Sequence, residues 1–352
     1  MPERICLGVE SSCDETALAL VRGGRLLAQT LASQADLHAI FGGVVPELAS
    51  REHLRYLGPL FDELLIRADC KAGDIDAVAV ARGPGLLGSL LTGVAFAKGL
   101  SLSLGAPLIG VNHLHAHLLA VGLTEAIPFP ALGLVVSGGH TDLYLMHSPW
   151  DMEKIGRALD DAAGEAFDKV GAAIGLRYPA GRAVDELAAS ALRPLDSLPR
   201  PYLHNDNLNF SFSGLKTAAV QLARSRGIGS AGKNGSDMGE FCLALNEAIA
   251  DTLAIKVARA LEVNPGINVL CVAGGVAANA LVRRKLAAVM AGRGGRCLVP
   301  DLKYCTDNAA MIAYAGYLLD RAGFAHDLSL EAIPRGSPVP LDWRRSNAPC
   351  LS

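Results

Sequence analysis

Hydrophobic and polar positions along this chain follow two patterns, which together predict strands alternating with helices. Short apolar runs bounded by glycine or polar residues are typical of buried strands. They lie at residues 4–10, 16–21, 25–31, 75–81, 107–111, 131–137, 141–146, 267–273 and 296–300. Stretches with helical spacing predict one helix that ends near Leu104, one that begins at NHLHAH, and others at 46–68, 164–175, 181–192, 213–226, 238–263, 279–292 and 307–322. This alternation indicates a layered α/β protein, not a sandwich or a bundle.

Glycine and proline refine this outline. Gly23–Gly24 lies between two of the strands and predicts a hairpin, and Gly58–Pro59 predicts a kink or a break in the helix at 46–68. Residues 193–236 are rich in Pro, Asn, Gly and Ser, which predicts a long irregular connection. The proline-rich tail after about residue 333 is expected to lie extended on the surface.

The composition limits the class of protein. The chain has 352 residues, which at roughly 150 residues per domain indicates two domains. A net charge of −3 and an aromatic content of 5% argue against a stand-alone nucleic-acid binder, which would be basic and rich in stacking side chains. A nucleic-acid partner would therefore need a local patch or a helper protein.

Cysteine usage and hydropathy indicate the compartment. The eight cysteines are scattered without a CxxC pair, which is typical of buried thiols in a reducing compartment. The most apolar stretch, Gly88–Gly110, contains Lys98 and several Gly and Ser residues, so it lacks the uninterrupted span of about 20 apolar residues that a membrane helix needs. The N-terminus is charged and has no secretory apolar segment. We expect a soluble, cytoplasmic protein.

Three glycine-containing loops follow or interrupt apolar strands: GVESSCDET at 8–16, VVSGGHT at 135–141 and VAGGVAAN at 272–279. Glycine lets a backbone approach a phosphate, and the following N–H groups donate to it. One such loop is more often a plain tight turn, but three, with Asp14 and Glu15 in the first, predict a nucleotide held between two lobes. None matches a P-loop or a good GxGxxG motif. The two halves each place such a loop after a buried strand, which hints at a duplicated unit.

The string NHLHAHLLA carries the metal signal. His113 and His117 are four apart on a predicted helix, so they project from one face at a spacing that suits two imidazoles on one ion. His115 lies roughly 200° around the helix from His113 and should not share the site. A plain histidine cluster is the commoner meaning of an isolated HxxxH, but apolar neighbours favour the metal here, because a buried uncompensated pair is costly. A third ligand must come from elsewhere; Asp307 is a candidate, although by itself it is better predicted to be a helix cap.

Together these strings closely resemble one family, the TsaD proteins, the threonylcarbamoyl transferases of tRNA modification that were once labelled glycoproteases or O-sialoglycoprotein endopeptidases. The resemblance runs from about Gly8 to about Leu330. It rests on GVESSCDET, FGGVVPELASREH, GPGLLGSLLTG, HxxxH, VSGGHT, DDAAGEAFDKV, FSFSGLKT, AGGVAAN and CTDNAAMIAYAG, in that order.

The resemblance implies an ASKHA fold, two actin-like lobes of ribonuclease-H type with a nucleotide in the cleft. We accordingly expect an N-terminal lobe at 1–135, a C-terminal lobe at 136–333 with an irregular insertion near 193–236, and an extended tail at 334–352. The implied enzyme is an N6-L-threonylcarbamoyladenine synthase. It would transfer the threonylcarbamoyl group from threonylcarbamoyl-adenylate (threonylcarbamoyl-AMP) to N6 of adenosine 37 in tRNAs reading ANN codons, releasing AMP.

The resemblance also implies ligands and partners. By the family pattern His113, His117 and Asp307 hold one metal ion, usually iron(II), Fe²⁺, with zinc, Zn²⁺, as the alternative. Asp14 and Glu15 stand in the family's first phosphate-facing loop and are the candidate catalytic residues. The implied partners are tRNA, TsaB in a heterodimer, and TsaE, while TsaC-type synthases make the adenylate; no membrane is involved. The residues implied to hold the adenylate are Val135, Val136, Ser137, Gly138, Gly139, Asp168, Gly181, Asp185 and Asn279.

Two strings depart from the family pattern. HLHAH has His115 where an acidic residue is common, and YPAGR has Ala180 and Arg182 in place of the usual YPGGP residues. Both metal histidines and Gly181 remain, so activity is expected to survive, whereas Arg182 leaves the contacts around the adenylate open.

Three other functions compete with this one. A zinc protease needs HExxH, and Leu114 occupies the position of its general base. An iron oxygenase with two histidines and one carboxylate normally uses a β-barrel, whereas this chain alternates strands with helices. A non-catalytic ATP-binding scaffold of the ASKHA fold stays open, although it would leave the HxxxH and Asp307 set without a purpose.

Overall fold

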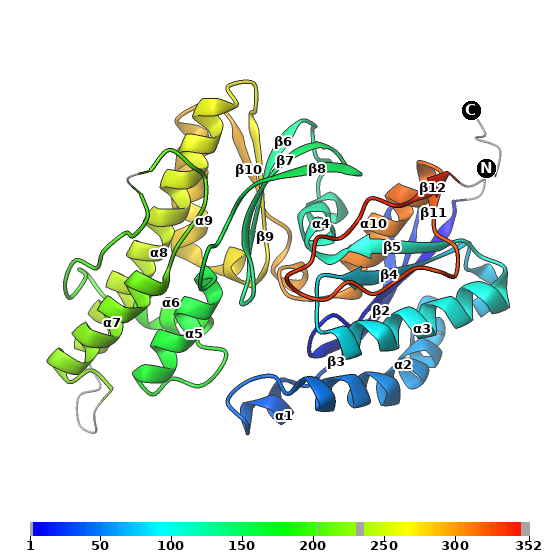
Figure 1. Cartoon of the computed structure of the whole chain (residues 1–352), viewed down its shortest axis with the longest axis horizontal. Helices are drawn as coiled ribbons and strands as arrows, with labels where there is room; N and C mark the ends of the chain where they lie inside the picture. The colour runs from blue at the N-terminus through cyan, green and yellow to red at the C-terminus, as the bar shows by residue number, and fades with distance from the viewer. Residues whose placement is uncertain (1–2, 204, 230–235, 346–352) are drawn as a thin grey trace. The chain divides into compact units, whose positions relative to one another are not determined.

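Two five-stranded sheets of mixed direction organise the chain, each in its own compact unit (Figure 1). The computed structural model describes residues 3–203, 205–229 and 236–345. Unit 1 is Met1–Ala126 with Thr306–Ser352, and unit 2 is Ile127–Cys305. These bounds differ from the predicted lobes at 1–135 and 136–333, because the segment after Cys305 returns to the first unit.

The sheet of unit 1 has the order β3-β2-β1-β4-β5. The first three strands form an antiparallel meander, and β4 and β5 run parallel to β1. β1 and β4 are buried along their whole length, as expected for central strands covered on both faces. The strands are β1 Ile5–Glu10, β2 Glu15–Arg22, β3 Arg25–Ser33, β4 Ala77–Gly83 and β5 Leu108–Asn112, with the short pair β11 Phe324–Ala325 and β12 Arg344–Arg345.

Helices cover both faces of this sheet. The helices of unit 1 are α1 Ala35–Ala39, α2 Pro46–Ala68, α3 Leu87–Leu104, α4 His113–Leu119 and α10 Ala309–Arg321, with the short helices η1 Ala72–Asp74 and η2 Ala120–Leu123; the short helix η4 Leu302–Tyr304 belongs to unit 2. Side chains alternate along a strand, so Leu7 and Val9 pack with α2 and α3, whereas Gly8 faces α10. A Cβ on Gly8 would lie 2.3 Å from the backbone nitrogen of Ala313. This close packing of α10 on β1 explains why the segment from Thr306 belongs to unit 1.

The sheet of unit 2 repeats the topology of unit 1, with the order β10-β9-β6-β7-β8. β6, β7 and β8 form an antiparallel meander, and β9 and β10 continue parallel to β6. The two units therefore share one plan, which agrees with the duplication hinted at by the sequence. The elements are β6 Ala131–Val136, β7 Thr141–Ser148, β8 Asp151–Arg157, β9 Val269–Ala273, β10 Arg296–Leu298, α5 Ala163–Ala173, α6 Gly181–Ala189, α7 Ser213–Arg226, α8 Ser236–Val263, α9 Ala280–Ala291 and η3 Gly275–Ala278.

Most predicted elements are present, and three details are informative. The predicted helix at 46–68 has these bounds in α2 and is not broken at Pro59; Arg55, which loses a helical donor there, is exposed, so water can satisfy its carbonyl. The hairpin at Gly23–Gly24 is confirmed, with φ +56° and +84°. Strand β8 escaped prediction because DMEKIGR is a polar edge strand without an apolar run.

Hydropathy and cysteines add two observations. Among the described residues, α3 is the one helix long and apolar enough to cross a membrane, a property that core helices of water-soluble proteins share. The seven cysteines within the described residues are free thiols, as the sequence predicts.

Candidate functional site

Strand β5 leads directly into helix α4, and this junction carries the histidine pair. The side chain of Asn112 accepts hydrogen bonds from the backbone N–H groups of Leu114 (2.9 Å) and His115 (3.4 Å) and so caps the helix. His113 and His117 are then one turn apart, 6% and 2% exposed, with ring centroids 4.7 Å apart and planes at 87°. The helical spacing predicted for the pair is confirmed.

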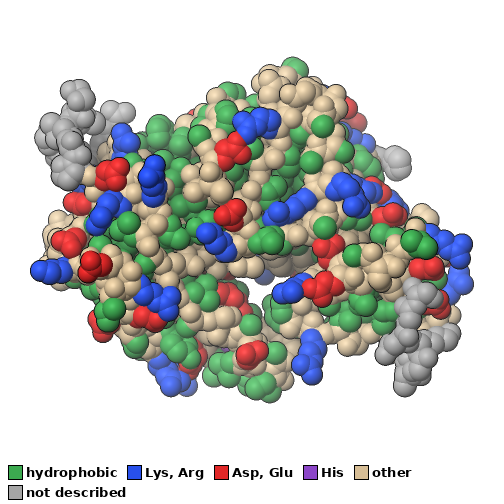
Figure 2. Space-filling model, turned by 180° about the vertical axis from the view of Figure 1, so that it is seen from behind, with side chains coloured by type: hydrophobic (Ala, Val, Ile, Leu, Met, Phe, Trp, Pro, Cys, Tyr) green, Lys and Arg blue, Asp and Glu red, His purple; other side chains and the backbone are tan. Residues whose placement is uncertain are grey.

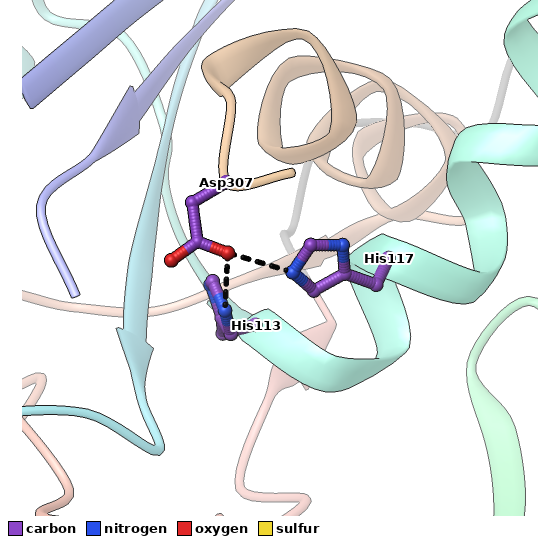
Figure 3. A group of neighbouring side chains, drawn as sticks. All are labelled: His113, His117 and Asp307. Atoms are coloured by element: carbon purple, nitrogen blue, oxygen red, sulfur yellow. Dashed lines mark hydrogen bonds and ion pairs between the residues drawn. The ribbon is translucent and has the colours of Figure 1, made fainter. Parts of the chain in front are cut away.

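Asp307, 190 residues further along the chain, meets this pair (Figure 3). Its Oδ1 lies 3.0 Å from Nε2 of His117 and 3.5 Å from Nε2 of His113. The expectation that Asp307 by itself caps a helix is wrong: Asn308 is the N-cap of α10, and its side chain accepts from the backbone N–H of Met311. Asp307 is thereby left to face the histidines.

The donor set fits a divalent metal ion. One nitrogen from each imidazole and one carboxylate oxygen lie within 4.8 Å of one another, the combination that zinc and iron(II) accept. His115 is not a member of this group, in agreement with its position around the helix.

A buried carboxylate behind the histidines orients one of them. Oε2 of Glu10, at the end of β1, lies 2.9 Å from Nδ1 of His113, and Oε1 accepts from the backbone N–H of Ser12 at 2.6 Å. Glu10 is fully buried. Because a carboxylate only accepts, Nδ1 of His113 carries a hydrogen, and Nε2, the nitrogen that faces Asp307, is the one that could bind a metal ion.

The electrostatics of the metal-free group follow from this arrangement. Burial disfavours the charged form of His113, but the carboxylates of Glu10 and Asp307 outweigh it and raise its pKa well above the usual value. Burial opposes the ionised form of Asp307 as well, yet His113 and His117 hold the pKa of Asp307 well below its usual value. The group thus needs positive charge at its centre, which a proton or a metal ion supplies.

Asp14 lies in the turn between β1 and β2, and Glu15 is the first residue of β2; both are half-buried. Burial, followed by the charges of Asp307 and Asp14, raises the pKa of Glu15 to about 9, and the hydroxyl of Ser33 donates to it at 3.3 Å. His53 on α2 fixes the same turn, since its two nitrogens lie 2.7 Å from Oγ1 of Thr16 and 2.9 Å from the carbonyl of Cys13.

The two other glycine loops belong to unit 2 and follow parallel neighbours, β6 and β9, so they lie at the same edge of the sheet. Gly274 has φ +93°, and a Cβ there would lie 2.4 Å from the carbonyl oxygen of Val136. Around Gly138 and Gly275, by contrast, a Cβ would meet no atom within 4 Å. The loops are therefore packed on each other through Gly274 and open at Gly138 and Gly275.

The remaining predicted adenylate residues are also in unit 2, in different settings. Val135 and Val136 end strand β6 with buried side chains, so only their backbone could reach a ligand. Ser137 turns the chain, and its hydroxyl accepts from the N–H groups of Gly139 and His140. Oδ1 of Asp168 on α5 accepts from the backbone N–H of Ala180 at 2.7 Å.

Asp168 thereby holds the start of α6, where Gly181 is the first residue. Burial raises the pKa of Asp168, and the hydrogen bonds from Ala180 and Gly181 offset part of that rise. Further along, Asp185 on α6 and Asn279 before α9 are linked through Asn246 on α8. Arg182 points elsewhere and pairs with Glu186 on the exposed face of α6.

Sequence reasoning missed Glu10, Ser12, His53 and Asn246. The first two stand inside the GVESSCDET string, where a buried strand ending in a carboxylate was the available signal. Nothing in the sequence pattern marks Asn246, because its partners are 61 and 33 residues away.

Comparisons with known proteins decide the family. A sequence model of the family described as TsaD, tRNA N6-adenosine threonylcarbamoyltransferase, matches residues 25–314. The chain belongs to this family. A protein of Desulfovibrio desulfuricans with that name is 58% identical over 97% of each chain, and one of Symbiobacterium thermophilum is 48% identical over 95% of this chain and 97% of its own.

Solved structures agree on the fold. T. kodakarensis HypF superposes with a TM-score of 0.59 at 12% identity, over 91% of this chain and 48% of HypF. Component A of the Acidaminococcus fermentans (R)-2-hydroxyglutaryl-CoA dehydratase gives 0.53 at 16% identity, over 90% and 98%. The predicted α/β ASKHA fold of this TsaD-family chain is confirmed.

Proposed function

We propose that this TsaD-family chain transfers the threonylcarbamoyl group of threonylcarbamoyl-adenylate to N6 of adenosine 37 in tRNAs that read ANN codons. The observation that carries this proposal is full-length similarity: a relative that bears the transferase name is 58% identical over 97% of the chain. A second observation, independent of the similarity, is the group of two histidines and one aspartate that could hold a metal ion.

The proposed cofactor is one divalent metal ion, iron(II) or zinc, held by His113, His117 and Asp307. Support comes from the convergence of three ligand atoms within 4.8 Å and from Glu10, which presents Nε2 of His113 as a lone-pair donor. When bound, the ion would act as a Lewis acid on an oxygen of the adenylate. Leu114 stands where a zinc protease has its glutamate, which disfavours peptide hydrolysis at this site.

The adenylate is assigned to unit 2. The open backbone at Gly138 and Gly275 supports a phosphate contact, because amides without side-chain cover can approach an anion closely. Asp168, Gly181, Asp185 and Asn279 complete the proposed set, together with Val135, Val136, Ser137 and Gly139.

In the reaction, N6 of the adenine forms a bond to the carbonyl carbon of the threonylcarbamoyl group, the bond from that carbon to the phosphate oxygen breaks, and AMP leaves as N6 loses a proton. This amine is a poor nucleophile, since its lone pair is delocalised into the ring. Positioning of the two reactants and loop amides that stabilise the departing phosphate would therefore supply most of the acceleration. Asp14 and Glu15 are the proposed catalytic carboxyls, and Glu15 can hold a proton at neutral pH because its pKa is raised to about 9.

We further propose that the protein works in the cytoplasm with TsaB, in a heterodimer, and with TsaE. An exposed apolar groove between α2 and α3, about 450 Å³ in volume, supports a protein partner on unit 1. Leu54 and Leu91 in this groove are 74% and 51% exposed. On the face drawn in Figure 2, lysine and arginine side chains are interspersed with acidic ones. Such a mixed surface would bind the phosphates of tRNA weakly, which supports a role for partner proteins in holding tRNA.

Mass spectrometry of tRNA nucleosides tests the function. Purified chain, TsaB, TsaE, threonylcarbamoyl-adenylate and unmodified tRNA should yield threonylcarbamoyladenosine and AMP in equal amounts. Absence of the modified nucleoside while the complex is intact would contradict the proposal and favour the ATP-binding scaffold. Leu54→Asp should abolish co-elution with TsaB, whereas Leu102→Asp, on α3 but outside the groove and 71% exposed, should not.

A further inference from the structure

Asn246 lies at the centre of a chain of hydrogen bonds in unit 2 that contains two of the proposed adenylate residues. Its Nδ2 donates to Oδ1 of Asp185 at 2.9 Å. Its Oδ1 accepts from Nδ2 of Asn279 at 2.8 Å. Asn246 is 1% exposed and comes from the middle of α8, whereas its partners belong to α6 and to the turn before α9.

The groups at the two ends of this hydrogen-bond chain determine the orientation of both side-chain amides in it. Asp185 can only accept, so the nitrogen of Asn246 faces it. The backbone N–H of Val282 can only donate, and it donates to Oδ1 of Asn279 at 3.0 Å. Asn279 therefore turns its nitrogen to Asn246, and no amide can flip without breaking two bonds. Both side chains are fixed in one rotamer.

A further hydrogen bond, to the backbone, joins the two ends of this network. Oδ2 of Asp185 accepts from the backbone N–H of Ala280 at 3.0 Å, at the first residue of α9. A carboxylate at a helix N-terminus is favoured by the helix dipole. Asp185 is therefore linked to Asn279 in two ways: through the backbone N–H of Ala280, which follows Asn279, and through the side chain of Asn246.

We infer that Asn246 is a positioning residue for the adenylate, acting through Asp185 and Asn279. This rests on the proposed function, which assigns those two residues to the adenylate. Buried at 1% exposure, Asn246 itself does not reach a ligand. Its removal would take a hydrogen-bond partner from the half-buried carboxylate of Asp185 and from the buried amide of Asn279, and both side chains would be free to leave the geometry that binds substrate.

The test compares Asn246→Leu and Asn246→Ala with Thr252→Val in the active complex. Thr252 is a matched control, because it is fully buried on the same helix and its hydroxyl donates only to the carbonyl of Ala248. The measured quantities are KM for threonylcarbamoyl-adenylate, kcat, and the inhibition constant of AMP. Thermal unfolding of each variant reports its stability.

Both Asn246 variants should raise KM and the AMP inhibition constant about tenfold, with kcat changed less than about threefold, because ground-state positioning is lost. Thr252→Val should leave both constants within about twofold of the wild type, even if it lowers the stability as much as the Asn246 variants do. Asn246→Ala keeps the test valid should the larger leucine prevent folding. Unchanged constants in the Asn246 variants would overturn the inference; an inactive wild-type complex would instead overturn the proposed function, and the inference with it.

Discussion

The carboxylate of Glu10 lies 2.9 Å from Nδ1 of His113, on the side of the ring that faces away from Asp307. Glu10 is the last residue of the buried strand β1, and His113 is the first residue of α4, so two rigid elements set the orientation of the ring. Partners of this kind fix the tautomer and raise the basicity of a metal-binding histidine. The metal centre therefore depends on a residue that would not itself touch the ion.

Glu10→Gln should weaken metal binding without removing a ligand. We expect the dissociation constant for Zn²⁺ to rise about 10- to 100-fold, as is typical when such a partner is lost. Competition with a chromophoric chelator measures it. Glu63→Gln is the control, since Glu63 lies on α2 and forms a solvent-accessible ion pair with Arg67. Equal affinities for the two variants would show that Glu10 does not orient the ring.

Glycines in unit 2 should separate stability from substrate binding. Gly274→Ala forces a side chain into φ +93° and to 2.4 Å from the carbonyl oxygen of Val136, so it should cost about 1–3 kcal/mol of stability. Gly138→Ala meets no protein atom within 4 Å and should leave the melting temperature unchanged, but should weaken adenylate binding because the methyl group covers the loop amides. Thermal unfolding and AMP inhibition are the two measurements. A Gly138→Ala variant with normal affinity would remove that loop from the site.

Stability should fall below pH 6.5 in part through His53. Burial of the His53 side chain lowers its pKa; the hydrogen bond to Cys13 and the charges of Glu10 and Asp14 only partly offset this. In the unfolded chain His53 binds a proton near pH 6.5, whereas in the folded chain it binds one only at lower pH. Stability is therefore lost as the pH falls, at most by about 1.4 kcal/mol per pH unit.

His53→Gln isolates this effect, because glutamine does not titrate. The variant should be less stable than the wild type at pH 7.5, and the difference should shrink as the pH falls from 6.5 to 5. Urea unfolding at each pH provides the comparison. A difference that stays constant over this range would mean that His53 keeps its ordinary pKa.

Local pattern predicted much of this fold and part of the site. The spacing of His113 and His117 on a helix after a buried strand followed from helical geometry alone. Position alone made Asp307 a candidate ligand but favoured a helix cap, so its assignment to the metal rested on family resemblance; the residue that caps α10 is Asn308. The placement of Glu10 and Asn246 depends on tertiary packing, and the return of α10 to unit 1 depends on the absence of a side chain at Gly8.

The most direct test of the account is single-turnover transfer to tRNA by a His113→Ala/His117→Ala double variant in the assembled complex, with AMP inhibition measured in parallel. The account predicts loss of stoichiometric metal and a fall in rate of at least about 100-fold, with AMP still bound as in the wild type. Transfer at the wild-type rate by the metal-free double variant would contradict it.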